Sequence, residues 1–273
     1  MTRPSEPFVA LPASARLHGE RWQGDGPPLV LLHAGVADRR SWHDVADGLA
    51  DREVVAYDRR GCGQSPVPTE VFSHVDDLVA VLDEIASEPA WLVGSSMGGG
   101  LAIDTALCMP ERVAGLVLLA PAVTGAPDPE VDFATEALGA ALEAAYEAGD
   151  LDEVNRLEAW IWLDGPAGPE GRVAGASREL FFAMNRILLE NGVAEDAGKS
   201  GVDAWERLGE LSIPTVVACG DLDVPFLVER CRQLADTIPS ARLVELAGLA
   251  HLPYLEDPRA VVDLVAAALA TQT

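Results

Sequence analysis

Basic residues are scarce in this sequence of 273 residues. It holds a single lysine, Lys199, and its 19 lysines and arginines stand against 44 acidic residues, which gives a formal net charge of −25. A field of this sign repels polyanions, so we expect neither nucleic acid nor an anionic membrane surface as a partner. The same acidity is typical of a well-solvated protein surface and requires no cationic partner.

Paired cysteines, long apolar runs and a signal-like start are also missing. The four cysteines show no C-x-x-C spacing, and Cys108 and Cys219 lie in apolar runs, as buried free thiols do. No apolar run reaches the roughly 18 residues that a membrane-spanning helix needs. Residues 1–7 contain no apolar signal core. These absences predict a cytoplasmic protein that does not span a membrane.

Strand-like and helix-like patterns alternate from residue 29 to residue 120. The strand-like stretches are short continuous apolar runs, the pattern of strands that are covered on both faces. They lie at residues 29–32, 54–57, 91–93 and 113–120, and two more follow at 214–219 and 242–246. This alternation predicts an α/β fold with a mostly parallel central sheet that is covered by helices on both faces.

The alternation stops between residues 125 and 209. Helical segments rich in alanine and glutamate follow one another there without a strand between them, at residues 133–148, 151–162 and 177–190. We interpret residues 125–209 as a helical cap that lies over the carboxyl ends of the strands, where an open parallel sheet binds ligands. The cap interrupts one core domain, which comprises residues 1–124 and 210–273.

Three aromatic residues of the predicted cap are candidate substrate contacts. Trp160, Trp162 and Phe181 lie in its helical segments, and their rings would form an apolar ceiling above the edge of the sheet. Helical spacing alone assigns at least half of the large apolar side chains in such a cap to its own core. Both roles therefore stay open for each of the three residues.

The pentapeptide Gly94-Ser95-Ser96-Met97-Gly98 follows an apolar run and opens a helix. It fits the G-x-S-x-G pattern, in which a sharp turn lifts the serine clear of the backbone and the glycines remove Cβ atoms that would clash. Ser96 is therefore the candidate nucleophile. The helix that begins beside it offers backbone N–H groups and the positive end of a dipole to a negatively charged oxygen.

A serine hydroxyl needs a base within hydrogen-bond reach before it attacks a substrate. Of the five histidines, His251 alone lies in a loop after a strand downstream of the cap, on the sheet edge predicted for Ser96. Asp223, in the loop after the preceding strand, is the candidate carboxylate that orients His251. Asp221 is the alternative, although it follows its strand so closely that its side chain can cap the turn instead. The chain order serine, aspartate, histidine fits this architecture.

Two further turns at the same predicted edge are rich in glycine. His33-Ala34-Gly35-Val36 follows the first buried strand, and a free N–H there is either a donor of an oxyanion hole or part of an ordinary strand-to-helix turn. The second turn is Asp58-Arg59-Arg60-Gly61-Cys62-Gly63-Gln64-Ser65. Its two arginines either bind an anion or have a structural role, paired with Asp58 or with carbonyls at the sheet edge.

Taken together, these stretches resemble the α/β-hydrolase family from about residue 15 to residue 270. The resemblance rests on five motifs in the family's order, which are His33-Ala34-Gly35, the D-x-R-G-x-G-x-S loop at 58–65, the turn at Ser96, Gly220-Asp221-Leu222-Asp223, and His251 with Pro253. Ala34 departs from the family, which usually has glycine at that position.

The resemblance implies a role for each matching residue. It implies Ser96 as nucleophile, His251 as general base, Asp223 as the orienting acid, and the backbone N–H groups of Gly35 and Met97 as the oxyanion hole. Because of the alanine at position 34, Val36 is a possible substitute for Gly35 as a donor.

Within the family, the likeness is to small capped esterases and lactonases, including the 3-oxoadipate enol-lactonase and aminoacrylate hydrolase types. It implies a serine hydrolase that cleaves a small-molecule carboxylic ester or lactone through an acyl-enzyme, without a metal or an organic cofactor. Two alternatives stay open. In the first, the same residues catalyse carbon–carbon bond hydrolysis, perhydrolysis or acyl transfer. In the second, the protein is a non-catalytic receptor for a small ligand. The sequence does not distinguish a monomer from a homodimer.

Overall fold

The computed structural model describes residues 3–12, 15–85, 88–192, 198 and 201–270. Its described strands form one sheet of eight, in the order β1-β2-β4-β3-β5-β6-β7-β8. The strands are β1 (Glu6–Ala10), β2 (Leu17–Trp22), β3 (Asp25–Leu32), β4 (Arg52–Tyr57), β5 (Ala90–Ser95), β6 (Val113–Leu119), β7 (Thr215–Gly220) and β8 (Ala241–Leu246). The pairs β1/β2 and β2/β4 are antiparallel and the other neighbours are parallel, which confirms the predicted mostly parallel sheet.

Helices cover both faces of this sheet, as the sequence predicts. Because successive side chains of a strand point to opposite faces, Val30 and Leu32 of β3 enter one core, and Leu29 and Leu31 enter the other. The first core is covered by α2 (His74–Ile85), α3 (Met97–Cys108) and α8 (Pro225–Thr237), and the second by α1 (His43–Gly48), α9 (Pro253–Glu256) and α10 (Pro258–Ala270). The continuous apolar runs in the sequence follow from this burial on both sides.

The order of the strands reverses next to β3, which lies between β4 and β5. The chain therefore leaves β3 toward one side of the sheet and returns to β5 on the other. At such a switch point, the loops that follow the carboxyl ends of the two strands diverge and leave a crevice for a ligand. The turns after β3 and β5, which carry Gly35 and Ser96, border this crevice.

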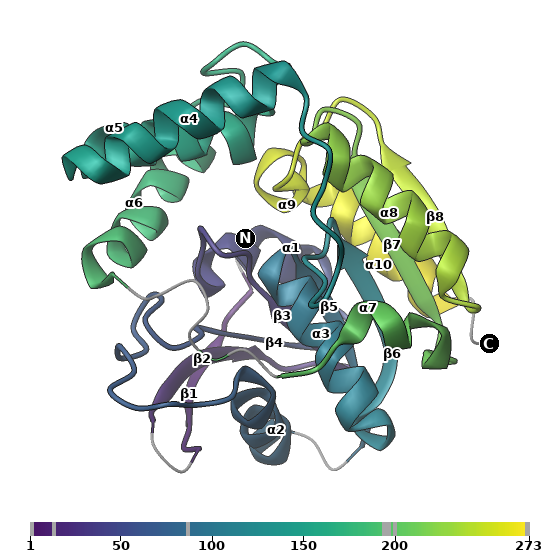
Figure 1. Ribbon diagram of the computed structural model, residues 1–273. Helices are drawn as coiled ribbons and strands as arrows, with labels where there is room; N and C mark the ends of the chain where they lie inside the picture. The colour runs from purple at the N-terminus through teal and green to yellow at the C-terminus, as the bar shows by residue number, and fades with distance from the viewer. Residues whose placement is uncertain (1–2, 13–14, 86–87, 193–197, 199–200, 271–273) are drawn as a thin grey trace.

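A group of helices is inserted between β6 and β7, and Figure 1 shows it above the sheet at one end of the molecule. It contains α4 (Phe133–Ala148), α5 (Leu151–Glu158), a π-helical turn (Ala159–Asp164) and α6 (Ala176–Asn191). We call the inserted segment from α4 to α6 the cap and the rest of the chain the body. Asp132 begins α4 by accepting hydrogen bonds from the backbone N–H groups of Ala134 and Thr135, and Gly149, with φ 67°, ends it.

The predicted cap limits differ from this arrangement at the carboxyl end. Helix α7 (Ala204–Arg207) lies against α3, and Ala204 and Leu208 belong to the core of the body. The cap therefore ends before residue 209, because these small and apolar side chains are buried under α3. Residues 193–197 and 199–200 of the predicted cap lie outside the described residues.

Besides the apolar packing of α6 in the second core, polar side chains of Arg172 and Asn191 join the cap to the body. Arg172 donates hydrogen bonds to the carbonyl oxygens of Leu163 at 3.0 Å and Gly248 at 3.2 Å, and it forms an ion pair with Glu256. Asn191 at the end of α6 donates to Gly61 O at 2.8 Å. The first contact holds the cap to the loop after β8 and the second to the loop after β4. None of the described helices is both long enough and apolar enough to span a membrane.

Candidate active site

Ser96 lies in the sharp turn between β5 and α3. Its backbone has φ 51° and ψ −117°, a combination that residues with a side chain rarely adopt. The flanking glycines make the turn possible. A Cβ on Gly94 would lie 2.4 Å from Gly98 O, and a Cβ on Gly98 would lie 2.2 Å from Leu32 O. The half-buried serine is thereby held at the carboxyl edge of the sheet, where it lines a cavity.

Asp223 and His251 follow β7 and β8, and the structure brings them into contact. Nδ1 of His251 lies 2.9 Å from Oδ2 of Asp223, and both side chains are almost fully buried. The other carboxylate oxygen, Oδ1, accepts a hydrogen bond from the backbone N–H of Val224 at 2.7 Å, which fixes the carboxylate. When Nδ1–H donates to this carboxylate, Nε2 is the nitrogen of His251 that can take up a proton.

Asp221, the alternative partner for His251, has a different contact. Its Oδ1 accepts a hydrogen bond from the backbone N–H of Gly248 at 2.6 Å, and the residue is exposed. This bond joins the loop after β7 to the loop after β8. Of the two aspartates, it is Asp223 that contacts the imidazole.

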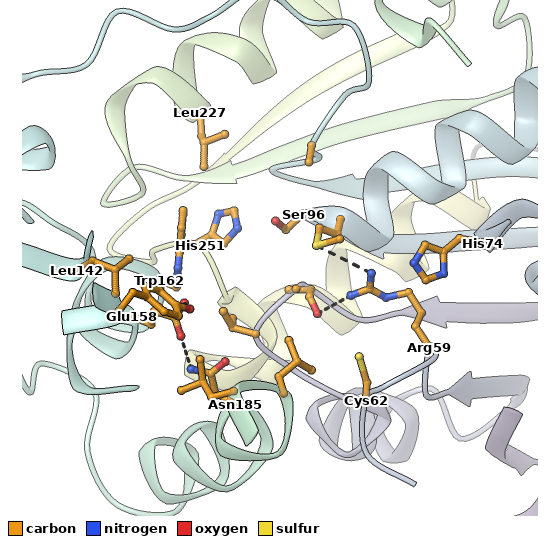
Figure 2. A pocket seen from close by; sticks show the side chains of 18 of the residues that line it. Arg59, Cys62, His74, Ser96, Leu142, Glu158, Trp162, Asn185, Leu227 and His251 are labelled. Carbon is orange, nitrogen blue, oxygen red and sulfur yellow. Dashed lines mark hydrogen bonds between the residues drawn. The ribbon is translucent and has the colours of Figure 1, made fainter. Parts of the chain in front are cut away.

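Ser96 and His251 line the same cavity, and Figure 2 shows the serine hydroxyl beside the imidazole ring. No hydrogen bond joins Ser96 Oγ to His251 within the part of the chain that the structure describes. Rotation about the Cα–Cβ bond of Ser96 moves the hydroxyl relative to the ring. Hydrogen bonds of this kind are commonly long without substrate and tighten when it binds.

The two backbone N–H groups predicted for an oxyanion hole belong to adjacent segments. A Cβ on Gly35 would lie 2.8 Å from Sδ of Met97, so the turn after β3 packs on the start of α3. As the first residue of α3, Met97 has no intrahelical acceptor for its N–H. Neither this N–H nor that of Gly35 donates to a described residue. Val36, the alternative donor, lines the cavity as well.

A cavity of about 640 Å³ lies between the edge of the sheet and the cap. Its size suits a small organic ligand. The body contributes the turns that carry Gly35, Ser96 and His251. The cap contributes side chains that include Leu142, Tyr146, Glu158, Trp162, Asn185 and Leu188.

One of the three aromatic residues predicted as substrate contacts lines this cavity among the described residues. Trp162 does so, with its ring centroid 4.8 Å from that of His251. Trp160 instead donates its indole N–H to Gly168 O at 3.0 Å and packs inside the cap, and Phe181 is fully buried. The structure therefore corrects the prediction for Trp160 and Phe181, because their helical positions turn both rings into the protein interior.

The arginines of the loop after β4 have different surroundings. Arg60 donates two hydrogen bonds to Asp77, at 2.7 and 2.6 Å, and both side chains are buried. Its structural role is therefore to pair with Asp77 rather than with Asp58.

His74 also lines the cavity, and burial together with the positive charges of Arg59 and Arg60 lowers the pKa of its imidazole to about 3.

Glu158, at the end of α5, is a cavity residue that the sequence analysis did not identify. Its carboxylate accepts hydrogen bonds from Tyr146 at 3.0 Å and from Asn185 at 2.5 Å, and burial raises its pKa. The signal in the sequence is its position four residues before Trp162, which places both on one helical face. No group of three histidine, cysteine, aspartate or glutamate side chains able to hold a metal ion occurs among the described residues.

Comparisons with known proteins identify the family of this chain. A family model described as the alpha/beta hydrolase family matches residues 29–264. The pimeloyl-(acyl-carrier protein) methyl ester esterase of Aeromonas hydrophila is 28% identical over 254 residues, which cover 89% of this chain and 95% of that protein. The esterase RhEst1 from Rhodococcus sp. ECU1013 is 26% identical, with a TM-score of 0.76 and coverage of 98% and 99% of the two chains. Est816, whose structure is described as that of an N-acyl homoserine lactone degrading enzyme, is also 26% identical, with a TM-score of 0.75 and coverage of 95% and 99%.

Proposed function

We propose that this chain, a member of the alpha/beta hydrolase family, is a serine hydrolase that cleaves a small-molecule carboxylic ester or lactone through an acyl-enzyme. The esterase among the similar solved structures supports this proposal. The observation that carries this proposal is the contact between His251 Nδ1 and Asp223 Oδ2 at 2.9 Å, on the wall of the cavity that Ser96 also lines. A histidine held by a carboxylate is the base that a serine hydroxyl requires.

In the first half of the proposed reaction, a change in the side-chain torsion of Ser96 brings its hydroxyl within hydrogen-bond reach of His251 Nε2. The histidine takes the proton as Oγ attacks the substrate carbonyl, and Asp223 stabilises the imidazolium that forms. The carbonyl oxygen becomes an oxyanion, which the N–H groups of Gly35 and Met97 bind. His251 then gives its proton to the leaving alcohol, and the acyl group stays on Ser96.

In the second half, water replaces the leaving group in the cavity. His251 takes a proton from this water as it attacks the acyl-enzyme, and the second oxyanion uses the same N–H groups. When the intermediate collapses, the proton returns to Ser96 Oγ and the carboxylic acid leaves. All proton transfers run through Nε2, so the reaction uses only groups of this chain, the substrate and water.

The cap sets the size of the substrate in this proposal. Trp162 and the aliphatic residues near it form an apolar wall, which favours an uncharged acyl or alcohol group of limited length. A substrate of the type used by 3-oxoadipate enol-lactonase or aminoacrylate hydrolase stays a prediction from the sequence, and so does a location in the cytoplasm.

The proposal is tested by assaying the protein on p-nitrophenyl esters of increasing chain length and on a panel of lactones. We expect turnover of short esters or lactones by the native protein and none above background by the Ser96→Ala variant, with an unchanged circular dichroism spectrum. Turnover by Ser96→Ala at the native rate contradicts the proposal. Tight binding of an ester without Ser96-dependent turnover would support a non-catalytic receptor instead.

A further inference from the structure

Arg59 is a buried cation without a carboxylate partner among the described residues. It lines the active-site cavity, it is 4% exposed, and its Nε has no hydrogen-bond partner. The other arginines near it differ, because Arg39 pairs with Asp58 and Arg60 pairs with Asp77. Burial of an arginine without a counter-charge is costly. The buried charge of Arg59 therefore requires an explanation, whereas the charges of Arg39 and Arg60 are explained by their ion pairs.

The guanidinium of Arg59 contacts both segments of the proposed oxyanion hole. Its Nη2 donates a hydrogen bond to Ala34 O at 3.0 Å, and its Nη1 lies 3.9 Å from Sδ of Met97. Figure 2 draws both contacts as dashed lines that leave Arg59 on the side facing Ser96. One cation thus joins the turn after β3 to the first residue of α3.

The contact with Ala34 O also determines the direction of the Gly35 N–H. The carbonyl of Ala34 and the N–H of Gly35 belong to one planar trans peptide, so they point in opposite directions. A donor that holds the carbonyl on one side therefore aims the N–H to the other. A hydrogen bond from a cation also polarises the peptide, which makes its N–H a stronger donor.

Arg59 supports the same peptide a second time through its own backbone. Its N–H donates to Nε2 of His33 at 3.0 Å, which requires the ring hydrogen of His33 to be on Nδ1. That Nδ1–H donates to Ala34 O at 2.8 Å. Burial and the charge of Arg59 hold the pKa of His33 well below its usual value, so the ring is neutral, and its two hydrogen bonds select this tautomer.

We propose that Arg59 is a positioning residue of the oxyanion hole, which aims the Gly35 N–H through the Ala34 carbonyl and braces Met97. Its positive charge is compensated by the oxyanion that forms on the substrate during each half of the reaction. This inference rests on the proposed function. It differs from a role in ground-state binding, because the counter-charge exists only in the tetrahedral intermediates and the transition states that lead to them.

The experiment compares the native protein with Arg59→Met, which keeps an unbranched apolar stem, although a shorter one, and removes the charge and the hydrogen bond of the guanidinium. Each protein is assayed on a neutral p-nitrophenyl ester and on an ester of equal length that ends in a carboxylate. Each is also inhibited with a trifluoromethyl ketone, which forms a tetrahedral adduct with serine, and with the matched methyl ketone. Arg112→Met is the control, because Arg112 pairs with Asp83 on the surface.

We expect Arg59→Met to lower kcat roughly 10- to 100-fold, the range that corresponds to the loss of a hydrogen bond from a charged group, with little change in KM. The inhibition constant of the trifluoromethyl ketone rises by a similar factor, and that of the methyl ketone stays the same. Arg59→Lys keeps the charge but loses the planar fork, so its loss of kcat is smaller. Arg59→Lys also serves as the test variant if Arg59→Met does not fold.

Three results would overturn the inference alone. The first is a native kcat in Arg59→Met. The second is a change confined to the KM of the carboxylate ester, which would make Arg59 a substrate-binding residue. The third is an equal rise in the inhibition constants of both ketones, which would make the role of Arg59 structural. Absence of Ser96-dependent turnover in the native protein would instead overturn the proposed function together with this inference.

Discussion

The edge of the sheet and the wall of the cap face each other across one cavity, and they hold their polar side chains by different means. At the sheet edge, Ser96 follows a strand directly, and its own backbone N–H is bonded to Leu119 O of the next strand at 2.9 Å. In the cap, Glu158 is held by the neutral side chains of Tyr146 and Asn185. A backbone hydrogen bond fixes the first position, whereas hydrogen bonds from side chains hold the second.

This difference indicates that the two regions have different functions, the sheet edge in the reaction and the cap in the selection of the substrate. Groups that must be placed within a few tenths of an ångström for a reaction are best carried by strand ends, which neighbouring strands hold on both sides. A wall that selects the shape of a substrate tolerates replacement of one apolar side chain by another. We therefore expect substitutions at the sheet edge to change kcat or stability, and substitutions in the cap to change the choice of substrate.

The largest expected effect is at the carboxylate of the sheet edge. Asp223→Asn keeps the size of the side chain but no longer enforces the right tautomer of His251, so we expect kcat to fall roughly 1,000- to 10,000-fold. Asp221→Asn is the matched control, because its side chain can still accept the hydrogen bond of Gly248. Steady-state kinetics of both variants on one p-nitrophenyl ester measure the difference. A larger loss in Asp221→Asn would reverse their roles.

The sheet edge is also the region where sequence is most informative. The G-x-S-x-G pattern places Ser96 in its turn because only glycine fits where Gly94 and Gly98 meet neighbouring backbone, at 2.4 and 2.2 Å for a hypothetical Cβ. Likewise, the loop positions of Asp223 and His251 follow from the parallel sheet. A turn whose backbone geometry requires glycine can therefore be recognised from the sequence.

No comparable sequence pattern shows which side chains of the cap line the cavity. Helical spacing shows that Trp160, Trp162 and Phe181 lie on helices, but the direction of each ring depends on how α5 and α6 pack, which spacing does not determine. The π-helical turn from Ala159 to Asp164 adds to the difficulty, because it changes the rotation between successive side chains. For the two loop arginines the sequence suggests Asp58 or carbonyls at the sheet edge as structural partners. It does not indicate Asp77 as the partner of Arg60, because this pair joins the loop after β4 to α2.

The next effect concerns the stability of the body. The buried pair of Arg60 and Asp77 loses one charge in Asp77→Asn, and we expect the free energy of unfolding to fall by roughly 3–5 kcal/mol, because Arg60 keeps its charge in the interior. On the cap surface, Glu153→Gln breaks the exposed pair with Arg156. Salt bridges of this kind contribute little. Thermal unfolding of both variants compares the regions, and equal changes in Tm would contradict the difference we infer.

The cap prediction is a change of substrate preference. Trp162→Leu replaces a large ring beside His251 by a smaller side chain and so enlarges the cavity. We therefore expect the ratio of kcat/KM for long p-nitrophenyl esters to kcat/KM for short ones to rise roughly 10-fold. Trp160→Leu is the matched control, because that ring packs inside the cap and should affect stability rather than the ratio. The same shift in both variants would mean that the cap acts as a whole and not through Trp162.

The smallest expected effect is a pH dependence of stability. Burial raises the pKa of Glu158 in the folded protein, so folding favours its neutral form, and stability decreases as pH rises from the ordinary glutamate pKa through the raised one. Glu158→Gln does not titrate. Its Tm relative to the native protein should therefore rise as the pH is raised from about 5 to about 8. Glu143→Gln, an exposed acid of α4, is the control. A Tm difference that falls over this range would contradict the argument.

The central claim is that the turn after β5, together with the imidazole of residue 251, makes one alcohol oxygen reactive. It is tested most directly by treating the protein with a fluorophosphonate and locating the adduct by mass spectrometry of its peptides. We predict one phosphonyl group, on Ser96, formed at least 100-fold more slowly in His251→Asn, in line with the contribution of a general base. An adduct on another residue, or an equal rate in His251→Asn, would contradict the account.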